Sequence, residues 1–324
     1  MRKAFKKAML FSAAAAGAAI GGVHGLYRYI FRSPSGRQND DYLLPGPFRS
    51  QGLRARSLAL IDALNSHPFE KVGITSFDGL ALSGRYYHTS DGAPVAILCH
   101  GYRGTPSRDF CGGADICFFL GCNVLLIEQR AHCSSGGHTI TFGVNERRDV
   151  LSWCNWAAER FHAPILLAGI SMGGAAVLMA SELDLPDNVR GIVADCPYTS
   201  PRAIIRRECE RKHFPAALLM PPIRLSARLF GGFSLSEPVN AVEAVRHARV
   251  PILLIHGEED DYVPCDMSRE IAAANPKLVE FHTFPGAWHG ASYLVNTERY
   301  TRIMRAFCYR VLPELKPDDM TTAP

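Results

Sequence analysis

The chain has 324 residues, of which 47% are hydrophobic and 20% charged, and its formal net charge is +4. This composition excludes a disordered or fibrous protein, and it supplies a large core without metal or disulfide staples. Residues 1–50 carry eight basic and two acidic residues, whereas the rest of the chain carries 27 basic and 29 acidic residues. A nearly neutral body lacks the clustered cations that nucleic-acid binding needs, so we expect no nucleic-acid partner.

The N-terminus combines a basic start with a long uncharged stretch. Four Lys or Arg residues within the first seven positions precede residues 8–27, which contain no Asp, Glu, Lys or Arg. Twenty such residues are enough to span a bilayer, and a basic flank before an apolar run is also typical of a signal peptide. We therefore predict that residues 1–32 form a membrane anchor or signal segment, with a soluble helical arm as the third interpretation.

This interpretation predicts where the body of the protein lies. Basic residues before an anchor favour a cytoplasmic N-terminus, which places the body on the outer face of the cytoplasmic membrane. Membrane association then runs through residues 8–27, and a secreted or a cytoplasmic protein is the alternative. Residues 33–52 are rich in Ser, Pro, Gly and Asp and are predicted to form a linker.

Residues 53–313 alternate between strand-like and helical patterns. Short runs of Val, Ile and Leu between turn residues predict buried parallel strands, and an earlier hairpin has its turn at Asp78–Gly79. Helical periodicity separates the runs, for example over residues 150–161. The strand-like segments are the hairpin at 76–89 and the runs at 94–101, 123–129, 164–171, 189–197, 250–257 and 277–286. The alternation predicts an α/β fold with a mainly parallel sheet and helices on both faces.

One insertion interrupts this alternation. Residues 199–236 have no strand pattern, and they carry seven basic residues, two glutamates and many bulky apolar residues. We predict that they form a helical lid over the strand ends. Their composition fits docking on an anionic membrane surface, and it fits equally a solvated basic face over a buried apolar one. Pro313 ends the last helical pattern and leaves residues 314–324 as a tail.

Most of the ten cysteines are predicted to be reduced core residues. No C-x-x-C spacing occurs, and several cysteines lie within apolar runs, where free Cys behaves as a small hydrophobic residue. The usual short spacing of zinc ligands is missing from the sequence, so we expect no metal site.

The strongest functional signal is the segment GISMGG at residues 169–174. It fits G-x-S-x-G between a predicted strand and a helix, which is the setting of a nucleophile elbow with Ser171 as the nucleophile. The tight turn leaves almost no room for side chains two positions before and after the serine, and both positions are glycine. The alternative interpretation is a flexible Gly/Ser turn without a catalytic role.

A serine hydroxyl needs a base, and the base needs a carboxylate. His289 lies on a loop after the last predicted strand, at the end of the sheet where Ser171 is expected, and we predict that it is the base. The segment HGEEDDYVP at 256–264 offers four carboxylates after a buried strand, and Asp195 is the backup acid. His100 and His256 begin His-Gly pairs at strand ends and are interpreted as structural loop formers.

An oxyanion needs two preorganised donors. We predict the backbone amide of Met172, directly after the nucleophile, and the backbone amide of Tyr102 in the loop after the 94–101 run. A plain glycine turn is the alternative for that loop. The candidate pocket side chains are Tyr198, Tyr262 and Trp288.

These motifs resemble those of the α/β-hydrolase superfamily. The resemblance covers about residues 70–312 and rests on HGYRG, EQRAHCSSGGHTITFGVNERRD, GISMGG, HGEEDDYVP and GAWHG. It is nearest to the bacterial serine hydrolases grouped with serine aminopeptidase (S33-like) and monoacylglycerol-lipase-type domains. The family pattern HG-x-x-D-x-x-V-P implies that Asp260 is the acid, with Asp261 as the alternative.

The resemblance implies a hydrolase of acyl substrates that uses no cofactor. The expected substrate is a small-molecule carboxylic ester, with lipid-like esters included, and a peptidase, amidase or acyltransferase on the same triad is the alternative. A catalytically dead, membrane-tethered binding protein is the competing class. The chain departs from the family at Ala131 and Cys133, where the family pattern R-G-H-G-x-S has glycines, which puts the shape of that loop in doubt.

Overall fold

The computed structural model describes residues 17–33, 51–236 and 238–315. The described residues form an eight-stranded sheet in the order β1-β2-β4-β3-β5-β6-β7-β8. The strands are β1 (Glu70–Thr75), β2 (Ala81–Tyr87), β3 (Val95–Cys99), β4 (Asn123–Ile127), β5 (Ile165–Ile170), β6 (Val189–Asp195), β7 (Ile252–Gly257) and β8 (Val279–Phe284). β2 pairs antiparallel with β1 and β4, and all other neighbours are parallel. The predicted α/β fold is confirmed.

The strands follow the hydrophobic runs because both faces of the sheet are covered. Every residue of β3 and β4 is buried, as expected for central parallel strands. The predicted hairpin is displaced: its turn at Asp78–Gly79 lies between β1 and β2, but its first strand ends at Thr75 rather than beginning at residue 76.

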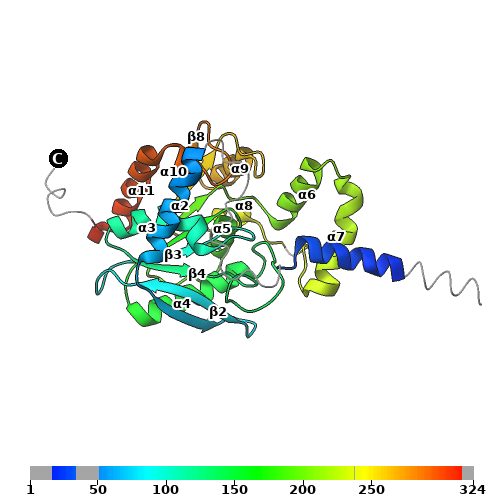
Figure 1. The fold of residues 1–324 in the computed structure, drawn as a ribbon, viewed down its shortest axis with the longest axis horizontal. Helices are drawn as coiled ribbons and strands as arrows, with labels where there is room; N and C mark the ends of the chain where they lie inside the picture. Colours follow the sequence, from blue (N-terminus) through cyan, green and yellow to red (C-terminus); the bar gives the residue numbers. More distant parts are fainter. Residues whose placement is uncertain (1–16, 34–50, 237, 316–324) are drawn as a thin grey trace, which may run out of the picture.

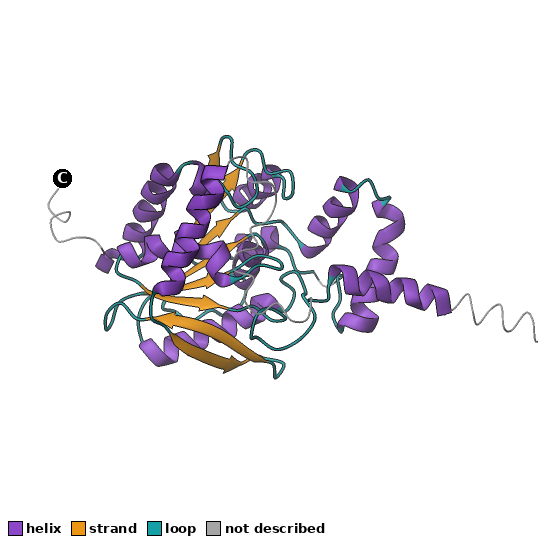
Figure 2. Cartoon of the chain, viewed as in Figure 1, coloured by secondary structure: helices purple, strands orange, loops and turns teal. Residues whose placement is uncertain are grey.

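Helices form a layer on each face of the sheet (Figure 2). The core on one face contains side chains of α2 (Gln51–Ser66), α3 (Pro106–Phe119) and α11 (Thr297–Val311). The core on the other face contains side chains of α4 (Glu146–Phe161), α5 (Met172–Ala180), α8 (Ala241–Arg246) and α9 (Cys265–Ala274). The short helix α10 (Ser292–Val295) precedes α11, and a single 3-10 turn (Pro313–Leu315) follows it. The rest of the predicted tail, residues 316–324, lies outside the described residues.

The predicted insertion is helical. It contains α6 (Pro201–Arg211) and α7 (Ala216–Gly231), which project to one side of the sheet and its covering helices in Figure 1. The buried face of α7 includes Met220 and Ile223, whereas Leu218 and Leu229 on the same helix are largely exposed. The helix therefore covers part of the core and leaves apolar side chains on the surface.

The described part of the N-terminal segment packs against this insertion. Residues 17–30 are helical, and Figure 1 shows this helix beside α7. His24 contacts the Phe230 ring at 4.7 Å between centroids, and Phe31 is fully buried. Among the described residues, no helix combines the length and apolar character needed to cross a bilayer. Residues 1–16 of the predicted anchor and residues 34–50 of the predicted linker lie outside the described residues.

Candidate active site

Ser171 occupies a strained turn between β5 and α5. Its φ of 55° lies in the left-handed region, which non-glycine residues rarely adopt and which is often found at functional sites. Its amide donates a hydrogen bond to the Asp195 carbonyl oxygen at 2.8 Å, which fixes the turn to β6. A Cβ atom on Gly173 would lie 1.8 Å from the Cys99 carbonyl oxygen, and one on Gly169 would lie 2.3 Å from the Gly173 backbone. The predicted steric need for both glycines is confirmed.

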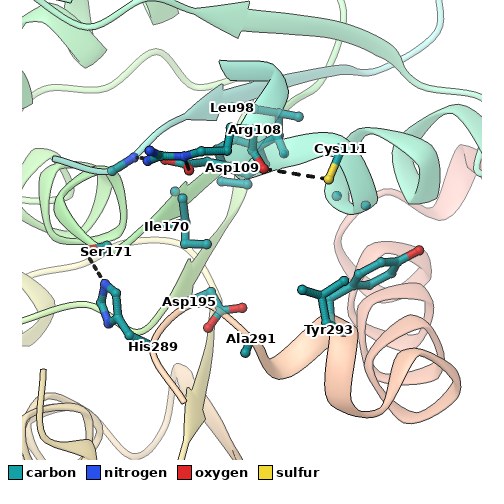
Figure 3. A pocket seen from close by; sticks show the side chains of 18 of the residues that line it. Leu98, Arg108, Asp109, Cys111, Ile170, Ser171, Asp195, His289, Ala291 and Tyr293 are labelled. Atoms are coloured by element: carbon teal, nitrogen blue, oxygen red, sulfur yellow. Dashed lines mark hydrogen bonds and ion pairs between the residues drawn. The ribbon is translucent and has the colours of Figure 1, made fainter. Parts of the chain in front are cut away.

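His289 lies between the Ser171 hydroxyl group and the Asp260 carboxyl group. Its Nε2 atom is 2.9 Å from Ser171 Oγ, and its Nδ1 atom is 2.7 Å from Asp260 Oδ2. Figure 3 shows the imidazole ring directed at Ser171. The structure thus brings together three side chains of which two, Ser171 and His289, lie 118 positions apart in the sequence.

Main-chain hydrogen bonds bring the loop that carries His289 to the loop that carries Asp260. The Glu258 amide donates to the Phe284 carbonyl oxygen and the Glu259 amide to the Ala287 carbonyl oxygen, each at 3.0 Å. Because these bonds join the ends of β7 and β8, the imidazole and the carboxylate are placed by the sheet itself.

The Asp260 carboxylate is fully buried and has four partners. Oδ1 accepts hydrogen bonds from the amides of Tyr262 and Val263 at 3.0 and 2.8 Å. Oδ2 lies 2.7 Å from His289 Nδ1 and 3.2 Å from His256 Nε2. Burial raises the pKa of Asp260, but the His289 charge and the hydrogen bonds from both histidines outweigh it and hold the pKa well below its usual range. Asp260 is therefore ionised wherever the protein is folded at neutral pH.

The carboxylate in turn sets the basicity of His289. Burial lowers the pKa of the imidazole, but the charge and hydrogen bond of Asp260 outweigh this effect, and Asp195 raises the pKa further. The net result is a pKa above the ordinary value. A basic imidazole whose Nε2 faces a serine hydroxyl group is able to accept its proton.

The contact of His256 with the acid was not predicted from the sequence. We interpreted this residue as a loop former, but its ring contacts the Asp260 carboxylate and is fully buried. Nε2 faces both Asp260 and the Val263 carbonyl oxygen, so that nitrogen carries a proton, and Nδ1 lies 2.7 Å from the Ser268 hydroxyl oxygen. The spacing of four residues between His256 and Asp260 was the available signal.

Of the two residues whose amides are predicted to bind an oxyanion, Met172 directly follows Ser171, and Tyr102 lines the same cavity as Ser171. Within the described residues, neither the Tyr102 nor the Met172 amide donates a hydrogen bond. The loop that carries Tyr102 is held by neighbouring contacts: the Gly101 amide donates to Asp109 Oδ2 at 2.7 Å, and the Arg103 amide donates to His132 Nε2 at 3.0 Å. Both amides are therefore free for a ligand.

A cavity of about 540 Å³ opens beside Ser171 and His289 and extends beneath α3, α10 and α11. Tyr262 and Trp288 line it, as the sequence analysis proposed, but Tyr198 does not. The Tyr198 side chain is buried in the core on the opposite face of the sheet, where its hydroxyl donates to the Phe142 carbonyl oxygen at 3.0 Å. The prediction for Tyr198 was therefore wrong.

Cys196, Asp260 and His289 form the cluster of potential metal ligands in the described part of the chain. Their ligand atoms lie within 4.8 Å of one another, and Cys196 Sγ is 4.0 Å from His289 Nε2. Burial raises the pKa of the Cys196 thiol well above its usual value, which disfavours the thiolate that binds metals. The Asp260 carboxylate and the His289 imidazole are also hydrogen-bonded to each other. All ten cysteines are free and most of them are buried, in agreement with the prediction for most of them.

Comparison with known sequences identifies the family of this chain. A sequence model of the prolyl oligopeptidase family matches residues 141–314, more than half of the chain. The chain belongs to the prolyl oligopeptidase family. It is thus an α/β-hydrolase, as the motifs predicted, and a hydrolase by class. The nearer resemblance to the serine aminopeptidase branch stays a prediction.

Proteins similar to this prolyl oligopeptidase family member include named enzymes and uncharacterized proteins. The uncharacterized protein YqkD of Bacillus subtilis is 24% identical over 238 residues, which cover 72% of this chain and 77% of that protein. The lysophosphatidylserine lipase ABHD12 of Rattus norvegicus is 25% identical over 246 residues, which cover 68% of this chain and 57% of that protein. Among solved structures, the esterase Pf2001 of Pyrococcus furiosus has the same fold, with a TM-score of 0.63 at 22% identity and coverage of 83% of this chain and 96% of that one.

Proposed function

We propose that the protein is a serine hydrolase that cleaves carboxylic esters through an acyl-enzyme. The observation that carries the proposal is the continuous hydrogen-bonded arrangement of Ser171, His289 and Asp260 beside a cavity that Ser171 and His289 line. A serine hydroxyl is a poor nucleophile at neutral pH, and this arrangement supplies the base and the orienting carboxylate that it needs.

The geometry supports a two-step reaction. Ser171 Oγ attacks the ester carbonyl carbon while its proton moves to His289 Nε2, and the amides of Met172 and Tyr102 stabilise the oxyanion. The tetrahedral intermediate collapses, and the alcohol leaves with the proton from His289. Water then attacks the acyl-enzyme with His289 as base and releases the carboxylic acid and free Ser171. Asp260 stabilises the imidazolium in both steps.

An ester is the favoured substrate because the cavity wall is mainly apolar. Leu98, Val193 and Met304 line its inner part, and an acyl chain would bury its surface against them. The names of an esterase and a lipase among the similar proteins support the same reaction. The family match favours a second candidate, hydrolysis of an amide bond, on the same three residues.

We also propose that residues 199–236 act as a lid. Arg211, at the end of α6, lines the cavity, and its guanidinium lies 5.4 Å from the centroid of the Tyr262 ring. Arg207 donates to the Asp261 carbonyl oxygen at 3.4 Å. The insertion therefore contacts the side of the cavity mouth where the acid loop lies, and a movement of α6 would widen that mouth.

A location on the outer face of the cytoplasmic membrane remains part of the proposal. The support comes from the four basic residues at the start of the chain and from the uncharged residues 8–27.

The test is a substrate screen with a nucleophile control. We expect p-nitrophenyl esters to be hydrolysed faster than aminoacyl anilides, and a fluorophosphonate probe to label the wild type but not Ser171→Ala. Faster cleavage of anilides would favour the amide candidate. A folded wild type that is neither labelled nor active would overturn catalysis and favour a binding protein on this fold.

A further inference from the structure

A buried carboxyl group lies in the cavity and takes no part in the proposed reaction. Asp195 ends β6 and is 6% exposed, and its side chain lines the cavity. Tyr300 also lines the cavity, and its hydroxyl group interacts with this carboxyl group and lowers its pKa. Oδ1, however, has no hydrogen-bond partner among the described residues. Figure 3 shows Asp195 beside Ala291 and near Ile170, with Cys111 and Tyr293 across the cavity.

The apolar surroundings make an unpaired Asp195 Oδ1 atom energetically unfavourable unless a ligand supplies a hydrogen-bond donor. An unpaired polar atom buried in an apolar environment destabilises the folded protein, and an unpaired charge destabilises it more. The neighbouring wall is apolar and includes Ala168 and Val193. No ion pair of Asp195 occurs in the described part of the chain. Two cationic side chains also line the cavity, but each forms an ion pair with another acid. Arg108 pairs with Asp109 and Arg211 with Glu208, each at 2.7 Å.

The charge of Asp195 follows from its neighbours. Burial raises its pKa to about 6, against the opposing effects of His256, the Tyr300 hydrogen bond and His289, while Asp260 raises it further. Asp195 is therefore mainly ionised at pH 7. An ionised carboxylate accepts hydrogen bonds and donates none, so its free oxygen can be satisfied only by a donor.

We propose that Asp195 binds a hydroxyl or ammonium group carried on the acyl part of the substrate and thereby sets acyl specificity. The inference rests on the proposed function, because attack by Ser171 is what places an acyl chain in this cavity. The volume of about 540 Å³ accommodates a substituted chain. The apolar wall binds the methylene groups, and Asp195 selects the chain whose donor reaches Oδ1.

A competing role for Asp195 is purely electrostatic. Its charge raises the pKa of His289, so its removal changes the rate with every ester. That effect is the same for substituted and plain acyl chains. Recognition of a donor instead changes the ratio of rates between the two, and this ratio is the diagnostic quantity.

The experiment compares p-nitrophenyl esters of plain, hydroxylated and amino-substituted acyl chains of matched length. For wild type we expect kcat/KM to favour a substituted chain over the plain chain by about tenfold or more at the length where the donor meets Asp195. Asp195→Leu should abolish this preference. Asp195→Asn keeps an acceptor without the charge, so it should retain part of a hydroxyl preference but lose an ammonium preference. Equal ratios in wild type and Asp195→Leu, or no preference at any length, would overturn the proposal.

A binding measurement separates this proposal from the proposed function. Calorimetry with Ser171→Ala should show tighter binding of the hydroxy or amino acid product than of the plain acid, and Ser171→Ala/Asp195→Leu should lose the difference. If wild type hydrolyses no ester but this binding difference is present, the donor site stands and the catalytic proposal fails. If esters are hydrolysed without any binding difference, catalysis stands and the donor site fails. If Asp195→Leu does not fold, loss of the ammonium preference in Asp195→Asn decides.

Discussion

The loop after β3, residues 100–104, is held from two sides by regions of different character. On one side lies the nucleophile elbow, where an added Cβ atom on Gly101 would sit 3.3 Å from the Ser171 Cβ atom. On the other side lie residues 17–33, whose main-chain oxygens accept hydrogen bonds from the loop. Tyr102 donates to the Ile30 carbonyl oxygen at 2.7 Å, and Arg103 donates to the Tyr29 carbonyl oxygen at 2.7 Å.

The two regions are encoded in different ways. The elbow is fixed by backbone atoms in van der Waals contact, so few sequences satisfy it and a short motif reveals it. Residues 17–33 are fixed by aromatic rings and side-chain hydrogen bonds to distant positions, for example Tyr27 to Thr139 at 2.8 Å. Many sequences satisfy such contacts, because partners at flexible side-chain ends adjust. The elbow should therefore tolerate fewer substitutions than the N-terminal segment.

Among the variants compared here, the greatest loss of activity is expected for a substitution of Asp260, whose carboxylate contacts His289. Asp260→Asn should lower kcat by about 10⁴-fold, because an amide cannot hold the imidazole in the right tautomer or stabilise the imidazolium. Without the charge that raises the pKa of His289, burial lowers this pKa, so the acid limb of the residual activity should move to lower pH. The measurement is a pH profile of kcat/KM for both proteins.

Asp261→Asn is the matched control for this prediction. Its neighbour's side chain, not its own, faces His289, so we expect less than about threefold change in kcat. A large loss in Asp261→Asn together with a small loss in Asp260→Asn would show that Asp261 is the acid.

The second prediction compares one substitution in the two regions. Gly173→Ala should cost more than about 4 kcal/mol of unfolding free energy or prevent folding, because its Cβ atom would overlap the Cys99 carbonyl group. Gly22→Ala, in the helix at 17–30, meets nothing within 4 Å and should be neutral or stabilising by up to about 1 kcal/mol. Urea unfolding measures both, and similar stability losses in the two variants would refute the contrast.

The third prediction concerns the buried anchor of the N-terminal segment. Phe31 is fully buried and contacts the Phe142 and Phe233 rings at 5.9 and 5.3 Å between centroids. Phe31→Ala should cost about 3 kcal/mol of packing free energy, through lost burial and the cavity left behind. Hydrogen exchange should show it as faster exchange of the Ile140 amide, which donates to the Phe31 carbonyl oxygen at 2.7 Å.

Tyr29→Ala provides the control, since the Tyr29 side chain is 60% exposed and its substitution should cost less than about 0.5 kcal/mol. Unchanged exchange of Ile140 in Phe31→Ala would mean that the segment is not held by this side chain.

The contrast also explains which features the sequence could reveal. Buried strands, the elbow and the residues Ser171, His289 and Asp260 follow from local patterns and motif register, and the structure places those three side chains in contact. The contact of His256 with Asp260 had a local signal in their spacing of four residues. The position of Tyr198 on the opposite face and the docking of residues 17–33 depend instead on how elements pack across the sheet. A single sequence does not encode these packings in a local pattern.

The weakest effect is expected where the two regions meet. Tyr102→Phe removes the hydroxyl group that donates to the Ile30 carbonyl oxygen but keeps the ring, which stacks on Phe142 at 4.8 Å between centroids. Loss of this hydrogen bond should cost about 1 kcal/mol of unfolding free energy. We expect kcat to change by less than about threefold, because the Gly101 and Arg103 amides still hold the loop through Asp109 and His132.

This variant measures how far the N-terminal segment controls the site. The proposed catalytic group of Tyr102 is its amide, so the hydroxyl group acts only through the position of the loop. A loss of more than tenfold in kcat with unchanged KM would show that contacts with residues 17–33 set the oxyanion geometry, and that the segment is part of the catalytic apparatus rather than a support. An unchanged kcat with a small loss of stability would show that the hydrogen bond from Tyr102 to Ile30 does not set the position of the loop.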